Sequence, residues 1–136
     1  MGSEPSFTAR IDSRNGVARI VLAGELDMDS LTSLTDRLKL AELDGARTIA
    51  LDLRDLTFMD SSGLRALLQA RDRARTNGHR FVIVGVGPSV RRVFEVSGME
   101  SLLDDDGATN ILDQFIGRSD ARHADRASRA KADGNA

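Results

Sequence analysis

The sequence of 136 residues contains no cysteine. This absence excludes a disulfide framework, a thiolate zinc site and a cysteine nucleophile. A basic excess is also missing, because 19 basic residues stand against 21 acidic ones, for a formal charge of −2. Binding driven mainly by the phosphates of a nucleic acid is therefore not expected, and we predict no direct nucleic-acid partner.

Long hydrophobic runs are absent as well. The apolar stretches are only a few residues long, far short of the ~20 residues that cross a bilayer. Residues 1–5 have neither the basic start nor the apolar run of a secretory signal. We predict a cytoplasmic protein that does not bind membranes.

Two segments resemble ligand-binding motifs without completing them. Gly85–Gly87 lacks the third glycine of a dinucleotide loop, and Pro88 after it has no N–H for a phosphate. Asp104–Asp106 lacks the spacing of a calcium loop. We interpret the first as a strand end and the second as a polar turn, and we predict no cofactor and no metal.

Short apolar segments alternate along the chain. Asn15–Gly16 is a strong hairpin signal and predicts antiparallel strands at 7–12 and 17–23. Apolar runs at 48–53 and 81–84 predict buried central strands. A weak further strand is possible around Leu102–Leu103.

Apolar residues at helical spacing predict four helices between and after these strands. The first is capped by Asp29 or Ser30 and ends at Gly45. The second ends at Asn77–Gly78, and the third begins at Pro88 and ends at Gly98. Their stripes are Leu31, Leu34, Leu38 and Ala41; Leu64, Leu67, Leu68 and Ala74; Val90, Val93 and Phe94; and Ile111, Leu112, Phe115 and Ile116.

The pattern predicts a single α/β domain with a mixed sheet of four to five strands and about four helices. An N-terminal hairpin supplies the antiparallel strands, and right-handed crossovers make the later strands parallel. We expect residues 1–6 to be flexible and residues 7–117 to form the domain. Residues 118–136 are expected to be a disordered or fraying polar tail, because alanine is their only apolar residue type.

Parallel strands place their following loops at one end of the sheet, where ligands of such sheets bind. The loops are residues 24–30, 54–63 and 85–89, and we expect the functional surface there. Arg71, Arg73 and Arg75 spread around the second helix, which favours a solvated face over a nucleic-acid patch.

Asp60–Gly63 lies at a strand-to-helix turn and has three interpretations. It can be a helix cap. It can hold a hydrolytic nucleophile, but His79 is predicted at the far end of the same helix and His123 in the tail, so no base is near. It can also be a phosphorylation site, because a helix N-terminus tolerates added negative charge.

The segment Phe58–Leu64 resembles the phosphorylation segment of anti-sigma-factor antagonists in the STAS-domain family. Gly24–Asp27 resembles an earlier loop of that family, and Val90–Phe94 with Ser97–Met99 resembles its third helix and stop. Together the three motifs span roughly residues 7–117. The resemblance implies a STAS-like fold and a regulatory protein that is not an enzyme.

The same resemblance implies a partner switch. The unphosphorylated protein binds an anti-sigma factor that is also a serine kinase, and a sigma factor is released. Phosphorylation ends the binding, and a serine phosphatase restores it. Ser61 aligns with the family's phosphoacceptor, and Ser62 is its rival. The expected partner-binding residues are Asp27, Asp60, Ser61, Ser62 and Gly63. The alternative is a constitutive regulatory or scaffold STAS module that phosphorylation does not control.

Overall fold

The computed structural model describes residues 6–103. Its elements are β1 (Phe7–Arg14), β2 (Val17–Leu26), the 3-10 helix η1 (Met28–Ser30), α1 (Leu31–Leu43), β3 (Thr48–Met59), α2 (Ser61–Thr76), β4 (Arg80–Val86), α3 (Pro88–Val96) and the 3-10 helix η2 (Glu100–Leu103). The predicted helix around residues 111–116, the turn at 104–106 and the tail at 118–136 lie outside the described residues.

The four strands form one sheet in the order β1-β2-β3-β4. β1 and β2 are antiparallel, whereas β2, β3 and β4 are parallel to one another. Asn15 and Gly16 join the hairpin with φ angles of 55° and 80°, the left-handed values that a two-residue hairpin turn requires. The mixed sheet and its N-terminal hairpin are as the sequence predicts.

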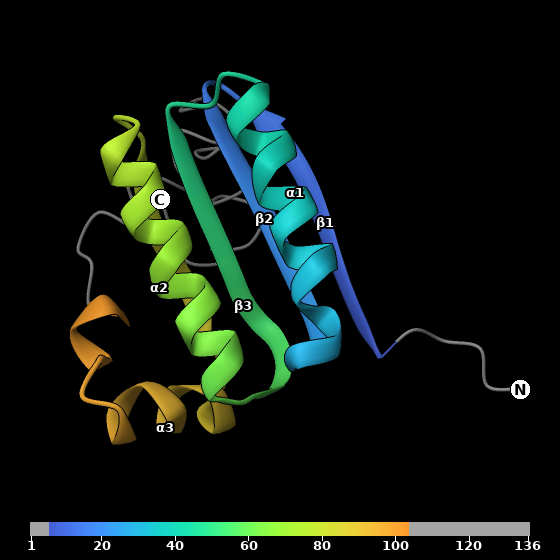
Figure 1. Ribbon diagram of the computed structural model, residues 1–136, viewed down its shortest axis with the longest axis vertical. Coiled ribbons are helices and arrows are strands. Elements are labelled where there is room, and N and C mark those ends of the chain that lie inside the picture. Colours follow the sequence, from blue (N-terminus) through green and yellow to red (C-terminus); the bar gives the residue numbers. More distant parts are fainter. Residues whose placement is uncertain (1–5, 104–136) are drawn as a thin grey trace, which may run out of the picture.

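Helices α1 and α2 lie side by side on one face of the sheet, and α3 lies near the ends of the strands (Figure 1). Alternate strand residues point toward these helices, so Leu51, Leu53 and Ile20 join their apolar stripes in the main core. The buried helix positions include Leu34, Leu38, Leu64, Leu67, Val90 and Phe94. These positions belong to the predicted stripes.

The opposite face of the sheet carries a smaller apolar cluster and a charged group. Val17, Ala50 and Val82 are buried there. Asp52, with 2% of its surface exposed, accepts hydrogen bonds from Arg19 at 2.7 Å and from Arg54 at 2.6 and 2.9 Å. Charge pairing thus stabilises a buried carboxylate on the side away from α1 and α2.

Two local predictions were wrong, and a third holds only in part. β3 does not end at Leu53 but continues to Met59, because Asp55, Leu56, Phe58 and Met59 still pair with β2 although polar residues interrupt the apolar run. Leu102 and Leu103 form part of η2 rather than a strand, and both pack against the main core. Ser30 occupies the N-cap position of α1 as predicted, but its side chain makes no capping hydrogen bond to that helix. Asp27 instead caps η1, which leads directly into α1.

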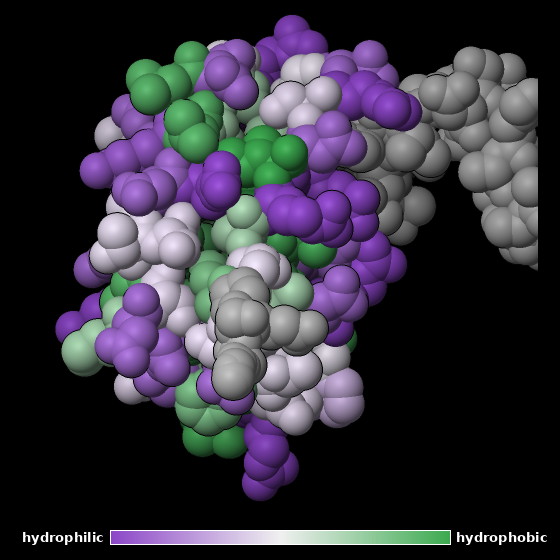
Figure 2. All heavy atoms as spheres, turned by 90° about the vertical axis from the view of Figure 1, so that its right-hand side faces the viewer, coloured by the Kyte–Doolittle hydropathy of each residue, from purple (hydrophilic) through white to green (hydrophobic). Residues whose placement is uncertain are grey.

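Figure 2 shows the side of the molecule that carries β1 and α1. Hydrophobic residues there form separate groups among hydrophilic ones. The exposed large apolar residues of α1 are Leu40 and Leu43. Within residues 6–103, no helix is both long and apolar enough to span a bilayer.

Candidate functional site

The carboxyl ends of β2 and β3 bring the two predicted loops together. Leu26 pairs with Met59 in the parallel register, and the Asp60 N–H donates to the Leu26 carbonyl at 3.3 Å. Asp27 and Asp60 each follow one member of that pair, so the first residues of both turns are neighbours. Because the strands extend further than predicted, the turns contain fewer residues than the predicted loops at 24–30 and 54–63.

Asp60 caps the N-terminus of α2. Its backbone is extended, and its carboxylate accepts the Gly63 N–H at 3.0 Å and the Ser62 hydroxyl at 2.6 Å. A capping carboxylate satisfies a backbone donor that has no partner within the helix. The structure confirms the capping interpretation of Asp60.

The two serines of this turn differ in their surroundings. Ser62 is partly buried, and its hydroxyl donates to Asp60. Ser61 is the first residue of α2 and is exposed, and its hydroxyl makes no hydrogen bond with another described residue. Ser61 therefore has the more accessible hydroxyl, and modifying it breaks none of the hydrogen bonds that hold the turn.

The hydrogen bond from the Ser62 hydroxyl, followed by that from the Gly63 N–H, lowers the pKa of Asp60 below its usual value. Both donors favour the charged carboxylate over the protonated acid. The residue before Ser61 is thus negatively charged at neutral pH. No acidic residue lies within the first turn of α2 itself.

Gly63 allows the start of α2 to approach the strand ends closely. A Cβ at this position would lie 2.9 Å from Cγ of Leu26 and 2.9 Å from Cγ of Met59. Such distances are shorter than van der Waals contact, so glycine's missing side chain is required here. The role of Gly63 in the structure is to position Ser61, because its own surface is buried.

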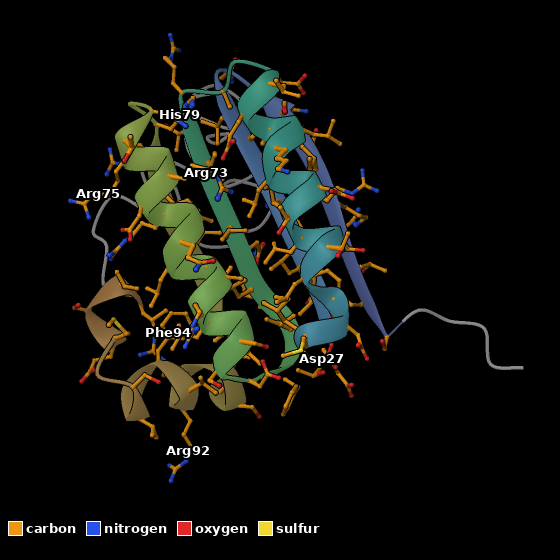
Figure 3. The ribbon with its side chains drawn as sticks, in the orientation of Figure 1. Asp27, Arg73, Arg75, His79, Arg92 and Phe94 are labelled. Carbon is orange, nitrogen blue, oxygen red and sulfur yellow. The ribbon has the colours of Figure 1, made fainter. Side chains whose placement is uncertain are left out.

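Asp27 organises the neighbouring turn. Its carboxylate accepts the Asp29 N–H at 3.0 Å and lies 3.0 Å from the Ser30 hydroxyl. That hydroxyl is also 2.8 Å from the Glu25 carbonyl oxygen. Asp27 remains half-buried and lies at the same end of the molecule as α3 (Figure 3).

The structure adds a groove that the sequence did not predict. Ser61 and Asp60 form one wall, and the other comes from α3, with a volume of about 340 Å³. Its remaining lining residues are Met59, Ser89, Arg92, Val93, Val96 and Ser97. Arg92 extends from α3 away from the body of the molecule (Figure 3). One residue in the sequence could have indicated this groove: Val96 is apolar but lies outside the predicted stripe of the third helix, so it had no predicted place in the core.

Exposed apolar side chains surround this end of the sheet. Val96 is 76% exposed in the groove, Met28 is 72% exposed in η1, and Phe58 is 47% exposed near the end of β3. Large apolar side chains grouped around a polar site are typical of protein-binding surfaces. The arrangement suits a protein partner better than a small polar substrate.

The hydrolase interpretation lacks a base in the described part of the chain. Its one histidine, His79, follows the end of α2, whereas Ser61 begins this helix of 16 residues. At 1.5 Å per residue, the helix separates the two by about 24 Å. Figure 3 shows His79 and Asp27 toward opposite ends of the molecule. Residues 6–103 also contain no group of three side chains suited to a metal ion.

Comparison with known proteins agrees with this geometry. Residues 9–104 match the family described as Mlab, STAS domain. The anti-sigma-B factor antagonist of Staphylococcus aureus is 28% identical over 92 residues, which cover 68% of this chain and 85% of that protein.

Solved structures with the same fold include two forms of one regulator. The anti-sigma factor antagonist SpoIIAA in its unphosphorylated form is 27% identical, with a TM-score of 0.65, covering 79% of this chain and 95% of that one. SpoIIAA of Bacillus in the phosphorylated form is also 27% identical, with a TM-score of 0.56, covering 70% and 87%.

Proposed function

The chain belongs to the STAS-domain family, and from this membership we propose that it is an anti-sigma-factor antagonist whose binding is switched off by phosphorylation of Ser61. Its relatives in Staphylococcus aureus and Listeria monocytogenes are anti-sigma-B factor antagonists. In the proposed cycle the unphosphorylated chain binds an anti-sigma factor and thereby releases a sigma factor. The chain acts in the cytoplasm as a binding protein rather than an enzyme.

The observation that carries the proposal is the exposed Ser61 hydroxyl at the start of α2. A kinase needs access to the acceptor oxygen, and Ser61 gives it without opening the turn. The neighbouring Ser62 hydroxyl is bonded to Asp60 at 2.6 Å, so its modification would disrupt the cap. These surroundings favour Ser61 over its rival.

A phosphate on Ser61 would alter the surface more than the fold. It adds roughly −1.5 to −2 charge at neutral pH, beside Asp60 and close to the turn of Asp27. The free N–H groups of a helix N-terminus accommodate such charge. SpoIIAA retains a fold similar to this chain in both its forms, which supports a switch that acts without unfolding.

The proposed contact surface is the turn of Asp27 together with Asp60, Ser61 and Ser62, and the exposed apolar side chains lie around it. Gly63, which is buried, contributes by holding this turn against the strand ends. A partner seated there would bury Met28, Phe58 and Val96. New charge within an apolar interface is costly, because the phosphate must lose its water. Phosphorylation would therefore weaken the complex.

The partner expected to phosphorylate the chain is an anti-sigma factor that is also a serine kinase, and a serine phosphatase would reverse the reaction. The test mixes the full chain with the cognate kinase and ATP and locates the phosphate by mass spectrometry. We expect one phosphate on Ser61, none in Ser61→Ala, and unchanged phosphorylation in Ser62→Ala. Phosphate on Ser62 alone would move the switch to the rival residue.

Binding to the anti-sigma factor, measured by calorimetry with and without ATP, separates the proposal from a constitutive STAS scaffold. We expect ATP to abolish binding of the original chain and to leave Ser61→Ala bound. Equal binding of both with ATP present would support the constitutive module. Ester hydrolysis that disappears in Ser61→Ala would instead show an enzyme.

A further inference from the structure

A second cleft lies at the end of the molecule away from Ser61. It has a volume of about 350 Å³, which is at the lower end of the range for small-molecule sites. Four of its lining residues are basic: Arg71, Arg75, His79 and Arg80. None of its described lining residues is acidic, so the cleft concentrates positive charge.

Arg71 and Arg75 lie one helical turn apart on α2, and both face the cleft. Arg73 between them faces α1, where its Nε lies 3.2 Å from a carboxylate oxygen of Glu42. The three arginines thus spread around the helix as the sequence predicts, but two of them share a site instead of forming a merely solvated face.

The Arg71 guanidinium is incompletely satisfied. Its Nε is buried without a hydrogen-bond partner, and its terminal nitrogen lies 3.4 Å from the exposed Asp72 carboxylate, which is a weak pairing. The Arg71 side chain as a whole keeps 28% of its surface exposed, so it can be reached from the cleft that it lines.

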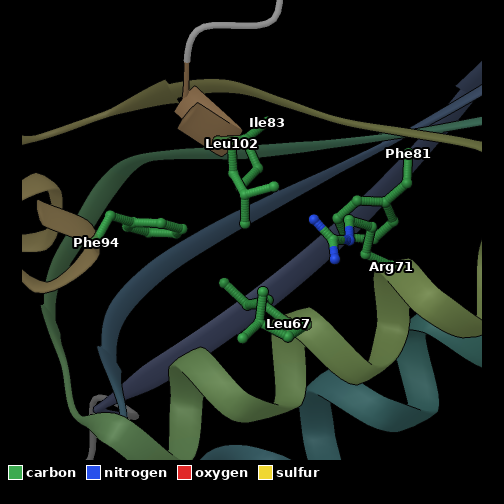
Figure 4. Close-up of a pocket in the computed structure, with 7 residues that line it drawn as sticks. Leu67, Arg71, Phe81, Ile83, Phe94 and Leu102 are labelled. Carbon is green, nitrogen blue, oxygen red and sulfur yellow. The ribbon is translucent and has the colours of Figure 1, made fainter. Parts of the chain in front are cut away.

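An apolar cavity of about 20 Å³ adjoins the cleft and shares Arg71, Phe81 and Leu102 with it. Figure 4 shows the Arg71 guanidinium next to Phe81, with Leu67 and Leu102 around the cavity. This volume is about that of one water molecule. Arg71 is the one polar residue of its lining, so a water there would lack the several partners it needs.

Two acidic residues of the described chain lie near the cleft without lining it. Asp72 on α2 and Glu100 on η2 are both exposed and outside its lining. The carbonyl oxygens of Arg73 and Ala74 at the end of α2 already accept N–H groups from Asn77 and His79. These hydrogen bonds reduce, but do not remove, the unfavourable effect of the helix C-terminus on an anion in the cleft.

We propose that this cleft binds a small organic phosphate monoester, with the phosphate against Arg71 and Arg75 and its apolar body toward Phe81 and Leu102. The planar guanidinium of an arginine can donate two parallel hydrogen bonds to one phosphate. Two guanidinium groups and an imidazole therefore suit a doubly charged phosphate ligand better than they suit a ligand with a single carboxylate. The adjoining apolar surface favours an ester over free phosphate.

The cleft works independently of the proposed phosphorylation, because Arg71 and Arg75 lie about 15 Å and about 21 Å along α2 from Ser61. The experiment titrates the full chain with phenyl phosphate and follows the backbone amide signals by NMR. We expect saturable shifts at residues 71, 75, 79–81 and 101–102. Inorganic phosphate should bind more weakly, and benzyl alcohol should not bind.

Matched variants separate a site from general charge attraction. Arg71→Gln should weaken phenyl phosphate binding by about tenfold or more, since it removes a charged hydrogen bond, and Arg75→Gln should weaken it less. Arg65→Gln removes the same charge from an exposed position on the same helix, and should leave binding unchanged. Circular dichroism checks that all three variants fold.

Asp104–Asp106 follow η2 directly in the sequence. Changing all three to asparagine should leave phenyl phosphate binding equal or tighter, since the change removes negative charge from the chain. The proposal is overturned by the absence of saturable shifts, by equal losses in Arg71→Gln and Arg65→Gln, or by weaker binding in the triple asparagine variant. Inorganic phosphate binding as tightly as phenyl phosphate would overturn the assignment of an ester.

Discussion

Two aspartates with lowered pKa values stabilise different parts of the molecule. At Asp52, burial alone would raise the pKa, but hydrogen bonds from Arg54 and Arg19 outweigh it and keep the carboxylate charged. At Asp60, the donors are the Ser62 hydroxyl and the Gly63 N–H. Asp52 joins β2 to β3 through Arg19, whereas Asp60 fixes the turn that presents Ser61.

We expect Asp52→Asn to destabilise the domain by about 1–3 kcal/mol, because Arg19 and Arg54 lose a charged acceptor. The folded pKa of Asp52 is below the unfolded value of about 3.9. Its contribution is therefore full above about pH 5 and is lost as the pH falls toward the folded pKa. Urea unfolding of the original protein and of Asp52→Asn, at pH 7 and at pH 3.5, should show that their difference in free energy of unfolding is smaller at pH 3.5.

The exposed Asp36 on α1 provides a control. Asp36→Asn should change the free energy of unfolding by less than about 0.5 kcal/mol at either pH. The loss in free energy of unfolding caused by Asp52→Asn should shrink toward pH 3.5. A loss that stays constant or grows would contradict the role of this carboxylate as a charged group.

At the scale of elements, the apolar periodicity predicted where α1, α2 and α3 lie, because their stripes bury against one sheet. It did not predict the full length of β3. Residues 54–59 include Arg54, Asp55 and Thr57, which resemble a loop in isolation. They form a strand because β2 offers backbone partners up to Leu26, a tertiary effect that a local pattern does not contain.

The close packing of α2 against β2 and β3 leads to a prediction for Gly63→Ala. Alanine favours a helix over glycine by about 1 kcal/mol, but its Cβ would meet Leu26 and Met59 at 2.9 Å. Overpacking of this kind costs about 1–3 kcal/mol. We expect the clash to win and the free energy of unfolding to fall by about 1–2 kcal/mol.

Urea unfolding measures this change, and NMR should show shifted amide signals for both Asp27 and Ser61. Gly45→Ala is the comparison, since Gly45 has a φ of +78° and nothing within 4 Å of a Cβ. Gly45→Ala should lower the free energy of unfolding by about 1–2 kcal/mol through backbone conformation alone. The NMR amide signal of Ser61 should not shift in this variant. An increase in the free energy of unfolding for Gly63→Ala would contradict the predicted clash, because it would show that the turn has room for a Cβ atom.

At the scale of the whole molecule, α2 separates two surfaces of different chemistry. Ser61 and the exposed apolar side chains lie at one end, and the basic cleft of Arg71 and Arg75 lies at the other. Parallel strand order predicted that the loops after β2, β3 and β4 would share one end. The wall that α3 adds beside Ser61 was not predictable, because the orientation of a short helix depends on its packing.

Ser61→Asp tests whether this end can change its charge while the rest of the molecule stays the same. An aspartate in the first turn of a helix typically stabilises it by about 0.3–1 kcal/mol, and nearby Asp60 offsets part of that gain. We expect unchanged helical content and a free energy of unfolding within about 0.5 kcal/mol of the original. Binding to the anti-sigma factor, measured by calorimetry, should weaken by about tenfold or more, because a charge enters an apolar contact.

Ser62→Asp provides the matched contrast one residue away. It removes the hydroxyl that donates to Asp60 at 2.6 Å and sets two carboxylates against each other in a partly buried turn. We expect this variant to lose about 1–2 kcal/mol of stability. Equal destabilisation of the two variants would mean that Ser61 helps to hold the turn, and charge placed there would then act by unfolding α2 rather than by altering the surface.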